Sequence, residues 1–389
     1  MKNKELSGKK YFELTEEQRI SWLRLIRSQN VGPATFRDLI SHYGTADSAL
    51  EAIPDLAKRG GAAARIKVCS REEAERELTR VKLSKSRLIG MGEPDYPENL
   101  RNADSGPPLL CVKGNVGILK QKAVAIVGSR NASISGLKVA ERFSMQLGEH
   151  GYTVVSGLAR GIDTAAHAAA IKSSTAAVFA GGVDVVFPPE NEKLAEELLA
   201  NQGAIVSEMP MGWQPRAKDF PRRNRIITGL SRAVIVVEAA RKSGSLITAR
   251  MANDSGRLVM AVPGSPLDPR CEGTNSLIRE GATLVTNIDE ILETLNPIDD
   301  EADALNSDIS EKERDLFEHE TTEKADLGIA VRDRIIGALG PSPVSVDDII
   351  QFAQATPGEV QMTLLELSLA GKIERHPGGL VSIIYEFSS

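Results

Sequence analysis

The sequence lacks the features that mark several large classes of protein. Its 389 residues contain three cysteines, which lie far apart and form no CxxC pair: Cys69, Cys111 and Cys271. This spacing excludes a disulfide framework and a clustered-cysteine zinc site, and it favours a reducing, cytoplasmic compartment. No apolar run approaches about 18 residues, so we expect no membrane span. The N-terminus lacks the apolar centre of a secretory signal.

The common catalytic and cofactor motifs are also missing. The five histidines form no HxxxH or HExxH pattern, and neither a GxSxG nor a GxxxxGK[ST] motif occurs. No GxGxxG loop supports a dinucleotide cofactor, and no pair of carboxylates stands out beyond one acidic stretch. We therefore expect a protein that is not an enzyme and that binds no cofactor or metal.

Charge is divided unevenly along the chain. The formal net charge of −6, taken alone, argues against a nucleic-acid partner. Residues Asp289–Asp326, however, hold fifteen acids and three bases, a net charge of −12, so the remainder carries +6. Residues Gln214–Arg257 hold ten bases and three acids, a net charge of +7. The acidic stretch is typical of a solvated spacer, whereas the basic region either attracts a polyanion or forms a solvated basic helix face.

The central residues 85–296 alternate between short apolar runs and helical patterns. The six apolar runs are Ala123–Val127, Tyr152–Ser156, Ala176–Ala180, Ala204–Ser207, Ala233–Glu238 and Leu258–Val262. Runs that are apolar almost throughout indicate strands buried on both faces. The alternation predicts an α/β fold: a Rossmann-like, doubly wound and mostly parallel sheet that binds ligands at the carboxyl ends of its strands.

Smaller segments flank this domain on both sides. Residues 1–84 predict a helical N-terminal domain of the SAM or helix-hairpin-helix type, with a turn at Asn30–Pro33, or else a plain helical packing domain. Residues 297–327 form the acidic linker. Residues 328–389 predict a winged helix from three helices and a hairpin. Its third helix has no Lys or Arg between Gln354 and Gly371, which favours a protein-contact or spacer role over duplex binding.

Glycine-bearing loops follow the first two predicted strands. Gly128, Ser129 and Arg130 precede a helix, so backbone N–H groups and the Arg130 guanidinium could bind a phosphate. Gly157 lies in the second loop, which ends at Asp163. Asp163 and His167 are spaced i, i+4, which fits either a catalytic pair or a helix-capping carboxylate beside a structural histidine.

Two basic segments follow later in the chain. The first segment places basic and polar residues on both sides of Phe220 in the sequence: Lys218, Arg222, Arg223, Asn224 and Arg225. This arrangement suits a single strand whose bases stack on an aromatic ring, or a core phenylalanine among solvated arginines. Directly after the fifth apolar run come Lys242, Ser243, Gly244 and Ser245. In a parallel sheet all these loops, with 262–264 and 273–275, share one edge, and their composition predicts a phosphate-binding surface there.

Six motifs resemble those of one protein family. They are IVGSR (126–130), SGLARGID (156–163), FPRRNRIITGLS (220–231), KSGSLITARMA (242–252), VPG (262–264) and GTNSLIREGA (273–282). Together, and in this order, they are similar to the core motifs of the DNA-processing protein A family, also called DprA or Smf. The resemblance covers about residues 85–296.

The resemblance implies a sequence-independent single-stranded DNA-binding protein. Such a protein forms a homodimer through the Rossmann-like domain, protects incoming single strands and loads RecA recombinase on them during natural transformation, displacing or bypassing single-strand binding protein. Applied to this sequence, the family's DNA contacts fall on Gly128, Ser129, Arg130, Gly157, Lys218, Phe220, Arg222, Arg223, Asn224, Arg225, Lys242, Ser243, Gly244 and Ser245. Phosphates would bind Arg130 and Lys242, a base would stack on Phe220, and Arg222 and Arg225 would line or brace the groove.

Two other functions remain open. Rossmann-like domains with glycine loops also occur in phosphoribohydrolases that cleave nucleoside monophosphates. Those enzymes share a PGGxGT loop, which this chain lacks, and release of a nucleobase would identify the activity. The other alternative is a structural adaptor whose C-terminal domain recruits a partner.

Overall fold

The computed structural model describes residues 3–6, 9–103, 106–297 and 329–384. Its contacts divide the chain into two compact units. One comprises Leu14–Arg76 and the described C-terminal residues, and the other comprises the first strands and the described residues from Glu77 to 297. The predicted acidic linker lies almost entirely outside the described residues, and the predicted domain limits stay predictions. No helix in the described part is long and apolar enough to cross a membrane.

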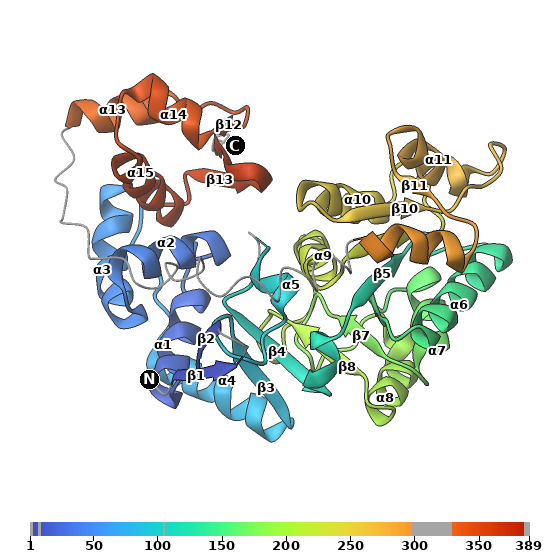
Figure 1. The fold of residues 1–389 in the computed structure, drawn as a ribbon. Coiled ribbons are helices and arrows are strands. Elements are labelled where there is room, and N and C mark those ends of the chain that lie inside the picture. Colours follow the sequence, from blue (N-terminus) through green and yellow to red (C-terminus); the bar gives the residue numbers. More distant parts are fainter. Residues whose placement is uncertain (1–2, 7–8, 104–105, 298–328, 385–389) are drawn as a thin grey trace. The chain divides into compact units, whose positions relative to one another are not determined.

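A nine-stranded sheet forms the centre of the larger unit (Figure 1), in the order β11-β10-β9-β5-β6-β7-β8-β4-β3. The strands are β3 (Ser86–Gly90), β4 (Leu109–Gly114), β5 (Ala123–Val127), β6 (Thr153–Ser156), β7 (Thr175–Val178), β8 (Ala204–Ser207), β9 (Ala233–Val236), β10 (Leu258–Ala261) and β11 (Thr283–Leu284). Strands β11 to β8 run parallel, whereas β4 pairs antiparallel with β8 and β3. The predicted Rossmann-like, mostly parallel sheet is confirmed. The six apolar runs correspond to β5 to β10, and β3, β4 and β11 extend the sheet beyond them.

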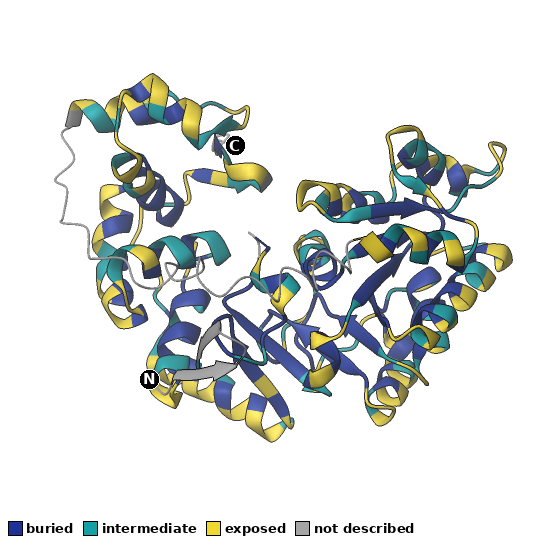
Figure 2. Ribbon diagram, viewed as in Figure 1, coloured by how far each residue is buried: buried dark blue, intermediate teal, exposed yellow. Residues whose placement is uncertain are grey.

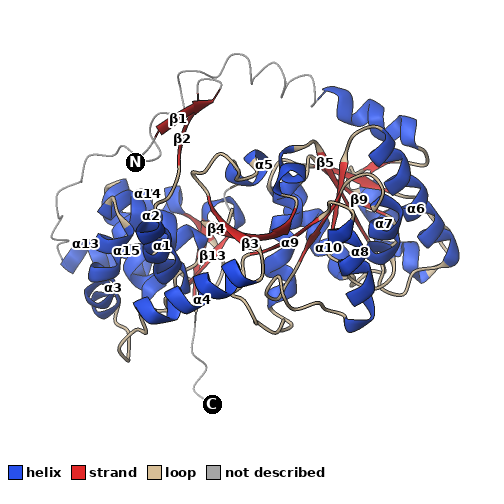
Figure 3. Ribbon diagram, turned by 90° about the horizontal axis from the view of Figure 1, so that it is seen from below, coloured by secondary structure: helices blue, strands red, loops and turns tan. Residues whose placement is uncertain are grey.

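Helices cover both faces of this sheet (Figure 3). They are α5 (Glu98–Arg101), α6 (Ile134–Glu149), α7 (Ile162–Ala170), α8 (Glu192–Ala200), α9 (Asp219–Leu230), α10 (Gly244–Asp254) and α11 (Glu272–Arg279), with 3-10 turns at Val116–Lys120, Pro189–Asn191 and Pro269–Cys271. The strand order moves away from β5 in both directions, so right-handed crossovers place α6 and α7 on one face and α10 on the other. Helix α9 packs against α10. The chain leaves β8 at the carboxyl edge of the sheet and returns through α9 to the start of β9, so α9 begins at the carboxyl edge.

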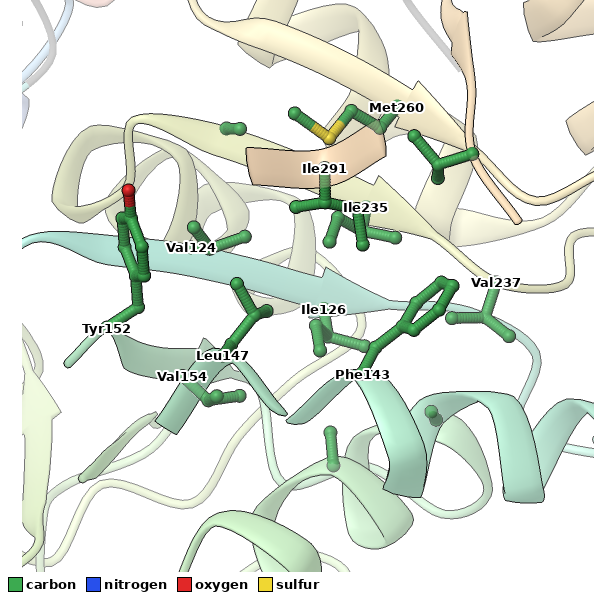
Figure 4. Close-up of a cluster of buried hydrophobic side chains, with 14 of the residues drawn as sticks. Val124, Ile126, Phe143, Leu147, Tyr152, Val154, Ile235, Val237, Met260 and Ile291 are labelled. Carbon is green, nitrogen blue, oxygen red and sulfur yellow. The ribbon is translucent and has the colours of Figure 1, made fainter. Parts of the chain in front are cut away.

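The core between the sheet and α6 fixes the two strands that support the candidate site (Figure 4). Val124 and Ile126 of β5, Ile235 of β9 and Phe143 and Leu147 of α6 are fully buried together. Figure 2 colours these central strands as buried along their length. Each such side chain stabilises the fold by about 1.5–3 kcal/mol. The loops that follow β5 and β9 therefore start from well-anchored strands.

The smaller unit combines N-terminal helices with a winged helix. Its N-terminal part contains α1 (Glu16–Arg27), α2 (Pro33–Tyr43), α3 (Ala46–Arg59) and the start of α4 (Arg71–Leu83). Its C-terminal part contains α13 (Ile329–Gly337), β12 (Val344–Ser345), α14 (Val346–Ala353), α15 (Pro357–Leu369), β13 (Ile373–His376), a 3-10 turn (Pro377–Gly379) and β14 (Leu380–Ile383). The predicted helical domain and winged helix are thus both present. Residues at the very start, expected to be helical, instead form the antiparallel pair β1 (Asn3–Leu6) and β2 (Lys9–Phe12) of the larger unit.

The third helix of the winged helix is buried against the N-terminal helices of the same unit. The Glu366 side chain is 2% exposed and pairs with Arg59 at 2.6 Å and with Arg332. Asn30, in the turn before α2, donates a side-chain N–H to the Leu369 carbonyl at 2.9 Å. A Cβ on Gly60 would lie 2.0 Å from the Glu366 carbonyl oxygen, so a larger residue does not fit there. Helix α15 is therefore covered where a DNA-reading winged helix exposes its recognition helix. The expectation that this domain does not read duplex DNA is consistent with this packing and stays a prediction.

Gly60→Ala should loosen this packing, because the new Cβ overlaps the backbone of α15. Overpacking of this kind costs about 1–3 kcal/mol. Hydrogen–deuterium exchange followed by mass spectrometry should become faster in Ala46–Arg59 and Pro357–Leu369. Gly337→Ala is the matched control, because nothing lies within 4 Å of a Cβ at that position in α13. Unchanged exchange in both helices of the Gly60→Ala protein would contradict the packing.

Candidate nucleic-acid interface

The loops predicted to bind DNA meet where the strand order of the sheet reverses. Strands β5 and β9 are neighbours, and the sheet continues outward from them in both directions. Rossmann-like sheets bind their ligands beyond the carboxyl ends of the strands at such a point. Arg130 follows β5 and Lys242 follows β9, so both residues belong to this edge. Gly157 follows β6, the neighbour of β5 on the other side.

The Gly128–Arg130 loop packs tightly against the loop that follows β6. The Ile162 N–H donates to the Ser129 carbonyl at 3.2 Å. Gly161 has a φ of +76°, and a Cβ there would lie 2.3 Å from the same carbonyl oxygen. A Cβ on Gly128 would lie 2.6 Å from the side chain of Ile162. The two loops therefore form one continuous surface, on which Arg130 is exposed.

A buried carboxylate occupies the N-terminus of α6. Glu238 accepts hydrogen bonds from the Ser133 N–H, at 2.9 Å, and from the Ser133 hydroxyl, which in turn accepts the Gly136 N–H. A Cβ on Gly136 would lie 2.5 Å from the Glu238 carboxyl carbon. The sequence predicted that backbone N–H groups at this turn bind a phosphate. The Glu238 carboxylate occupies the N-terminus of α6, a common phosphate site in such folds. Phosphate binding by the Gly128–Arg130 turn itself stays a prediction.

The basic run starting at Lys218 begins helix α9, so its side chains point in different directions. Helical spacing buries one face of α9, which includes Asp219, Arg223 and Ile226. Arg223 donates through Nη1 to the Gly157 carbonyl at 2.7 Å and to the Val178 carbonyl. Arg223, which the resemblance assigned to DNA contact, is therefore enclosed by protein and supports the loop after β6.

Asp163 holds the same loop from the other side. Its carboxylate accepts the N–H groups of Gly157 at 3.0 Å and Ala159 at 3.3 Å. Burial raises the pKa of Asp163, although the Arg223 charge and these two N–H groups lower it. Burial also lowers the pKa of Arg223 to about 10, against the opposing effect of Asp163. Both the N–H and the carbonyl of Gly157 are thus bonded within the protein, which leaves this residue a structural role in the loop.

Arg222 and Arg225 share a buried carboxylate on the flank of α9. Arg222 Nε lies 2.9 Å from a carboxylate oxygen of Glu208, and Arg225 also pairs with Glu208. Glu208 offsets part of their positive charge, so the pair braces the helix more than it attracts a polyanion. Asn224, between them in the chain, is half-buried.

Of the predicted site residues, one aromatic ring and three exposed cations without an acidic partner remain at the edge. The Arg130 guanidinium lies over the Phe220 ring, with Cζ 5.3 Å from the ring centroid. Lys218 and Lys242 are exposed. Within the described ranges, no ion pair engages Arg130, Lys218 or Lys242. These four side chains are the predicted residues best placed to meet a DNA strand.

The Lys242–Ser245 segment is built around the start of α10. Ser243 is the N-cap and accepts the Ser245 N–H at 3.3 Å. Gly244 is the first residue of the helix, and the side chain of Ser245 is buried. The two serines therefore shape the loop that presents Lys242.

Two aromatic residues at this edge were not identified from the sequence. Phe187 lies in the loop after β7, and the centroid of its ring is 5.6 Å from the ring centroid of Phe220. The Arg216 guanidinium lies 4.6 Å from the Trp213 ring centroid, and Trp213 Nε1 donates to Asp219 at the start of α9. Trp213 is close to the basic run in the sequence and could have been found from that. Phe187 stands far from the other site residues along the chain and has no comparable signal.

His167 is a structural histidine. Its Nδ1 lies 2.7 Å from the Thr175 hydroxyl, which itself donates to the Val154 carbonyl. Burial lowers the pKa of His167 to about 3, so the ring is neutral. Asp163 and His167 are both buried supports of this edge, and the geometry favours that interpretation over a catalytic pair.

His167 should make the protein sensitive to acid. The unfolded chain takes up a proton on this histidine below about pH 6.5, whereas the folded chain does not until about pH 3. Stability is therefore lost as the pH falls, by about 1.4 kcal/mol per unit, or about 2 kcal/mol between pH 6.5 and 5. Urea unfolding at several pH values should show a shallower dependence for His167→Asn. His150→Asn, which changes an exposed histidine, should keep the wild-type dependence; equal slopes for all three proteins would contradict the assignment.

Arg223→Met should destabilise the larger unit far more than Arg222→Met. Loss of Arg223 removes the positive charge that acts on the buried Asp163 carboxylate and leaves the Gly157 and Val178 carbonyls without their donor. Each buried polar group left without its hydrogen bond costs about 1–3 kcal/mol. Arg222 is partly exposed and Arg225 still pairs with Glu208 in its absence, so its loss should cost about 1 kcal/mol or less. Chemical unfolding midpoints measure the difference, and equal midpoints for the two variants would refute the supporting role of Arg223.

Three family models match the chain. The model for DNA recombination-mediator protein A matches residues 87–296, the DprA-like N-terminal HHH domain matches 16–79, and the DprA winged helix domain matches 320–379. Protein Smf of Escherichia coli is 38% identical over 315 residues, which cover 80% of this chain and 82% of that protein. The DNA processing protein DprA of Streptococcus pneumoniae is 47% identical over 199 residues, or 51% of this chain and 70% of that protein.

Two solved structures share the fold. The X-ray structure of DNA processing protein A from Streptococcus pneumoniae has a TM-score of 0.58 and 35% identity, covering 72% of this chain and 98% of that one. DNA processing protein A from Helicobacter pylori, described for its single-stranded DNA binding mode, has a TM-score of 0.50 and 27% identity, covering 55% and 97%. With a family model spanning more than half of the chain, over the sheet that supports the candidate site, the chain belongs to the DprA/Smf family.

Proposed function

We propose that this protein binds single-stranded DNA without sequence preference along the carboxyl edge of its parallel sheet. The observation that carries the proposal is the contact of Phe220 with Arg130, at an edge where Lys218 and Lys242 are also exposed. An aromatic platform beside cations without acidic partners suits a strand of stackable bases and phosphates. Family membership supports the proposal, as does the single-stranded DNA binding described for the relative from Helicobacter pylori.

Each group has a separate task in this proposal. The planar Arg130 guanidinium takes a phosphate through paired N–H groups, and Lys218 and Lys242 act as point charges along the backbone. Phe220 offers a face on which any base can stack. Contacts with phosphates and with ring faces carry little information about base identity, so the binding is sequence-independent.

We expect no catalytic step at this edge. The Glu238 carboxylate is committed to Ser133 at the start of α6, and Asp163 and His167 are buried with structural partners. Glu238 also counts against the phosphoribohydrolase alternative, because it fills the helix terminus that a nucleotide phosphate would use. No cluster of three or more His, Cys, Asp or Glu residues suited to a metal ion occurs among the residues that the structure describes.

Family membership also supports roles that need partners. We infer that the protein protects incoming strands and loads RecA recombinase on them during natural transformation, and that it bypasses single-strand binding protein. We further infer a homodimer formed through the Rossmann-like domain. Two DNA surfaces in one dimer would raise avidity for a long strand even if each surface alone bound weakly.

Arg130→Ala, Lys218→Ala and Lys242→Ala should each weaken binding to a labelled oligo-dT strand. Loss of a charged hydrogen bond at a phosphate predicts about a tenfold or larger increase in Kd. Each variant should also lower the slope of log K against log salt by about 0.7, because one fewer phosphate is neutralised. Fluorescence anisotropy across a salt series measures both quantities, and the matching duplex should bind more weakly than the single strand.

Lys172→Ala is the control for lost positive charge. Lys172 is exposed and precedes β7, so it belongs to the opposite edge of the sheet. This variant should bind the strand as the wild type does. Equal weakening by Lys172→Ala, or no binding of oligo-dT by the wild type, would remove the proposed function. The same samples should release no nucleobase from nucleoside monophosphates; release would favour the hydrolase alternative.

A further inference from the structure

We propose that Phe187 is a second base-stacking side chain and that the DNA-binding edge extends over the loop that follows β7. This inference rests on the proposed single-stranded DNA binding and adds a residue that neither the motifs nor the basic segments identified. Phe187 is 46% exposed, an unusually open position for a phenyl ring. Single exposed apolar residues are common on proteins, so exposure alone would not distinguish it.

The contact with Phe220 distinguishes Phe187 from other exposed apolar residues. The two ring centroids are 5.6 Å apart with an interplanar angle of 55°. Phe220 in turn contacts the Arg130 guanidinium. Arg130, Phe220 and Phe187 thus form a chain of contacts between three planar groups, contributed by the loops after β5 and β7 and by the start of α9.

The loop that carries Phe187 is anchored to the rest of the site. Asn191 is buried, and its side-chain N–H groups donate to the Leu158 carbonyl at 2.8 Å and to the Thr164 hydroxyl at 2.9 Å. Leu158 belongs to the same loop as Gly157, which Arg223 and Asp163 hold. On the exposed side, Arg160 pairs with Glu190. These bonds join the loop after β7 to the loop after β6, so the position of Phe187 is fixed relative to the phosphate-binding residues.

The ring geometry indicates how two bases would be held. Neighbouring bases in a regular stacked strand rise by about 3.4 Å, whereas the two phenyl centroids are 5.6 Å apart and tilted. The rings therefore cannot continue one regular stack of bases. Each ring would take its own base, and the strand would be splayed open between them. Stacking of this type tolerates any base, which agrees with binding that is independent of sequence.

Phe187→Ala should raise the Kd for an oligo-dT strand about tenfold, within the range found when a stacking aromatic residue is removed. The slope of log K against log salt should stay at the wild-type value, because no phosphate contact is lost. Phe187→Leu, which keeps an apolar side chain but no ring, should bind nearly as weakly as Phe187→Ala. Phe187→Tyr should restore the Kd to within about twofold. Phe352→Ala is the matched control, since it removes a phenyl ring that is 67% exposed in the winged helix.

An abasic strand of the same length separates base stacking from an indirect effect on the site. Phe187→Ala should bind the abasic strand as the wild type does, because the strand offers no base to the missing ring. An equal loss on the oligo-dT and abasic strands would overturn the inference, since it would mean that Phe187 only supports its neighbours. Wild-type Kd for oligo-dT in Phe187→Ala, together with weak binding by Phe220→Ala, would also overturn it while leaving the proposed function intact. Failure of the wild type to bind oligo-dT at all would instead count against the proposed function.

Discussion

The edge of the sheet that is proposed to bind DNA depends on the hydrogen bonds of the buried Arg223 guanidinium. Transferring this charge out of water is costly, and Asp163 and two backbone carbonyls offset that cost only in one orientation of α9. Because successive residues of a helix turn by about 100°, fixing Arg223 inward also fixes the directions of the other side chains on α9. Phe220 then meets Arg130, and Arg222 and Arg225 reach Glu208. Arg223 thereby fixes the rotation of α9 about its own axis and the position of the loop after β6.

Glu238 changes what the Rossmann-like fold can bind. Such folds commonly hold a small nucleotide by its phosphate at the N-terminus of the first helix. Here the Glu238 carboxylate takes that place by bonding to Ser133, and it leaves no room for a Cβ at position 136. Under the proposed function, anion binding then falls to exposed side chains such as Arg130, Lys218 and Lys242. Flexible cationic side chains can bind a long polyanion at many positions along its backbone. A rigid set of backbone N–H groups is instead suited to binding a single phosphate.

The sequence predicted strands β5 to β10 well because each is apolar almost throughout, and their order placed the glycine loops at one edge. It could not predict the direction of each cation in the run from Lys218 to Arg225. The run looks uniform in sequence, yet helical geometry buries Arg223, pairs Arg222 and Arg225 with Glu208 and leaves Lys218 exposed. The contact of Phe187 with Phe220 was missed because the two residues lie far apart in the sequence, and no basic residue adjoins Phe187. The burial of α15 could not be predicted from the sequence for the same reason. Its partners Asn30 and Arg59 lie more than 300 residues earlier in the chain.

The contact between Arg130 and Phe220 raises the question of whether the stacking face is open to a base. In the free protein the guanidinium lies over the ring. An exposed cation–π contact of this kind contributes about 0.5–1 kcal/mol, whereas a base stacked on an aromatic side chain contributes about 1–3 kcal/mol. Under the proposed function, a base would therefore displace the guanidinium, which would become free to follow the adjacent phosphate. Until then, the contact holds the ring and the cation together at the edge, which lowers the entropy lost when both engage a strand. In this proposal the contact orders both side chains in the absence of DNA, and the two separate to bind a phosphate and a base when a strand is present.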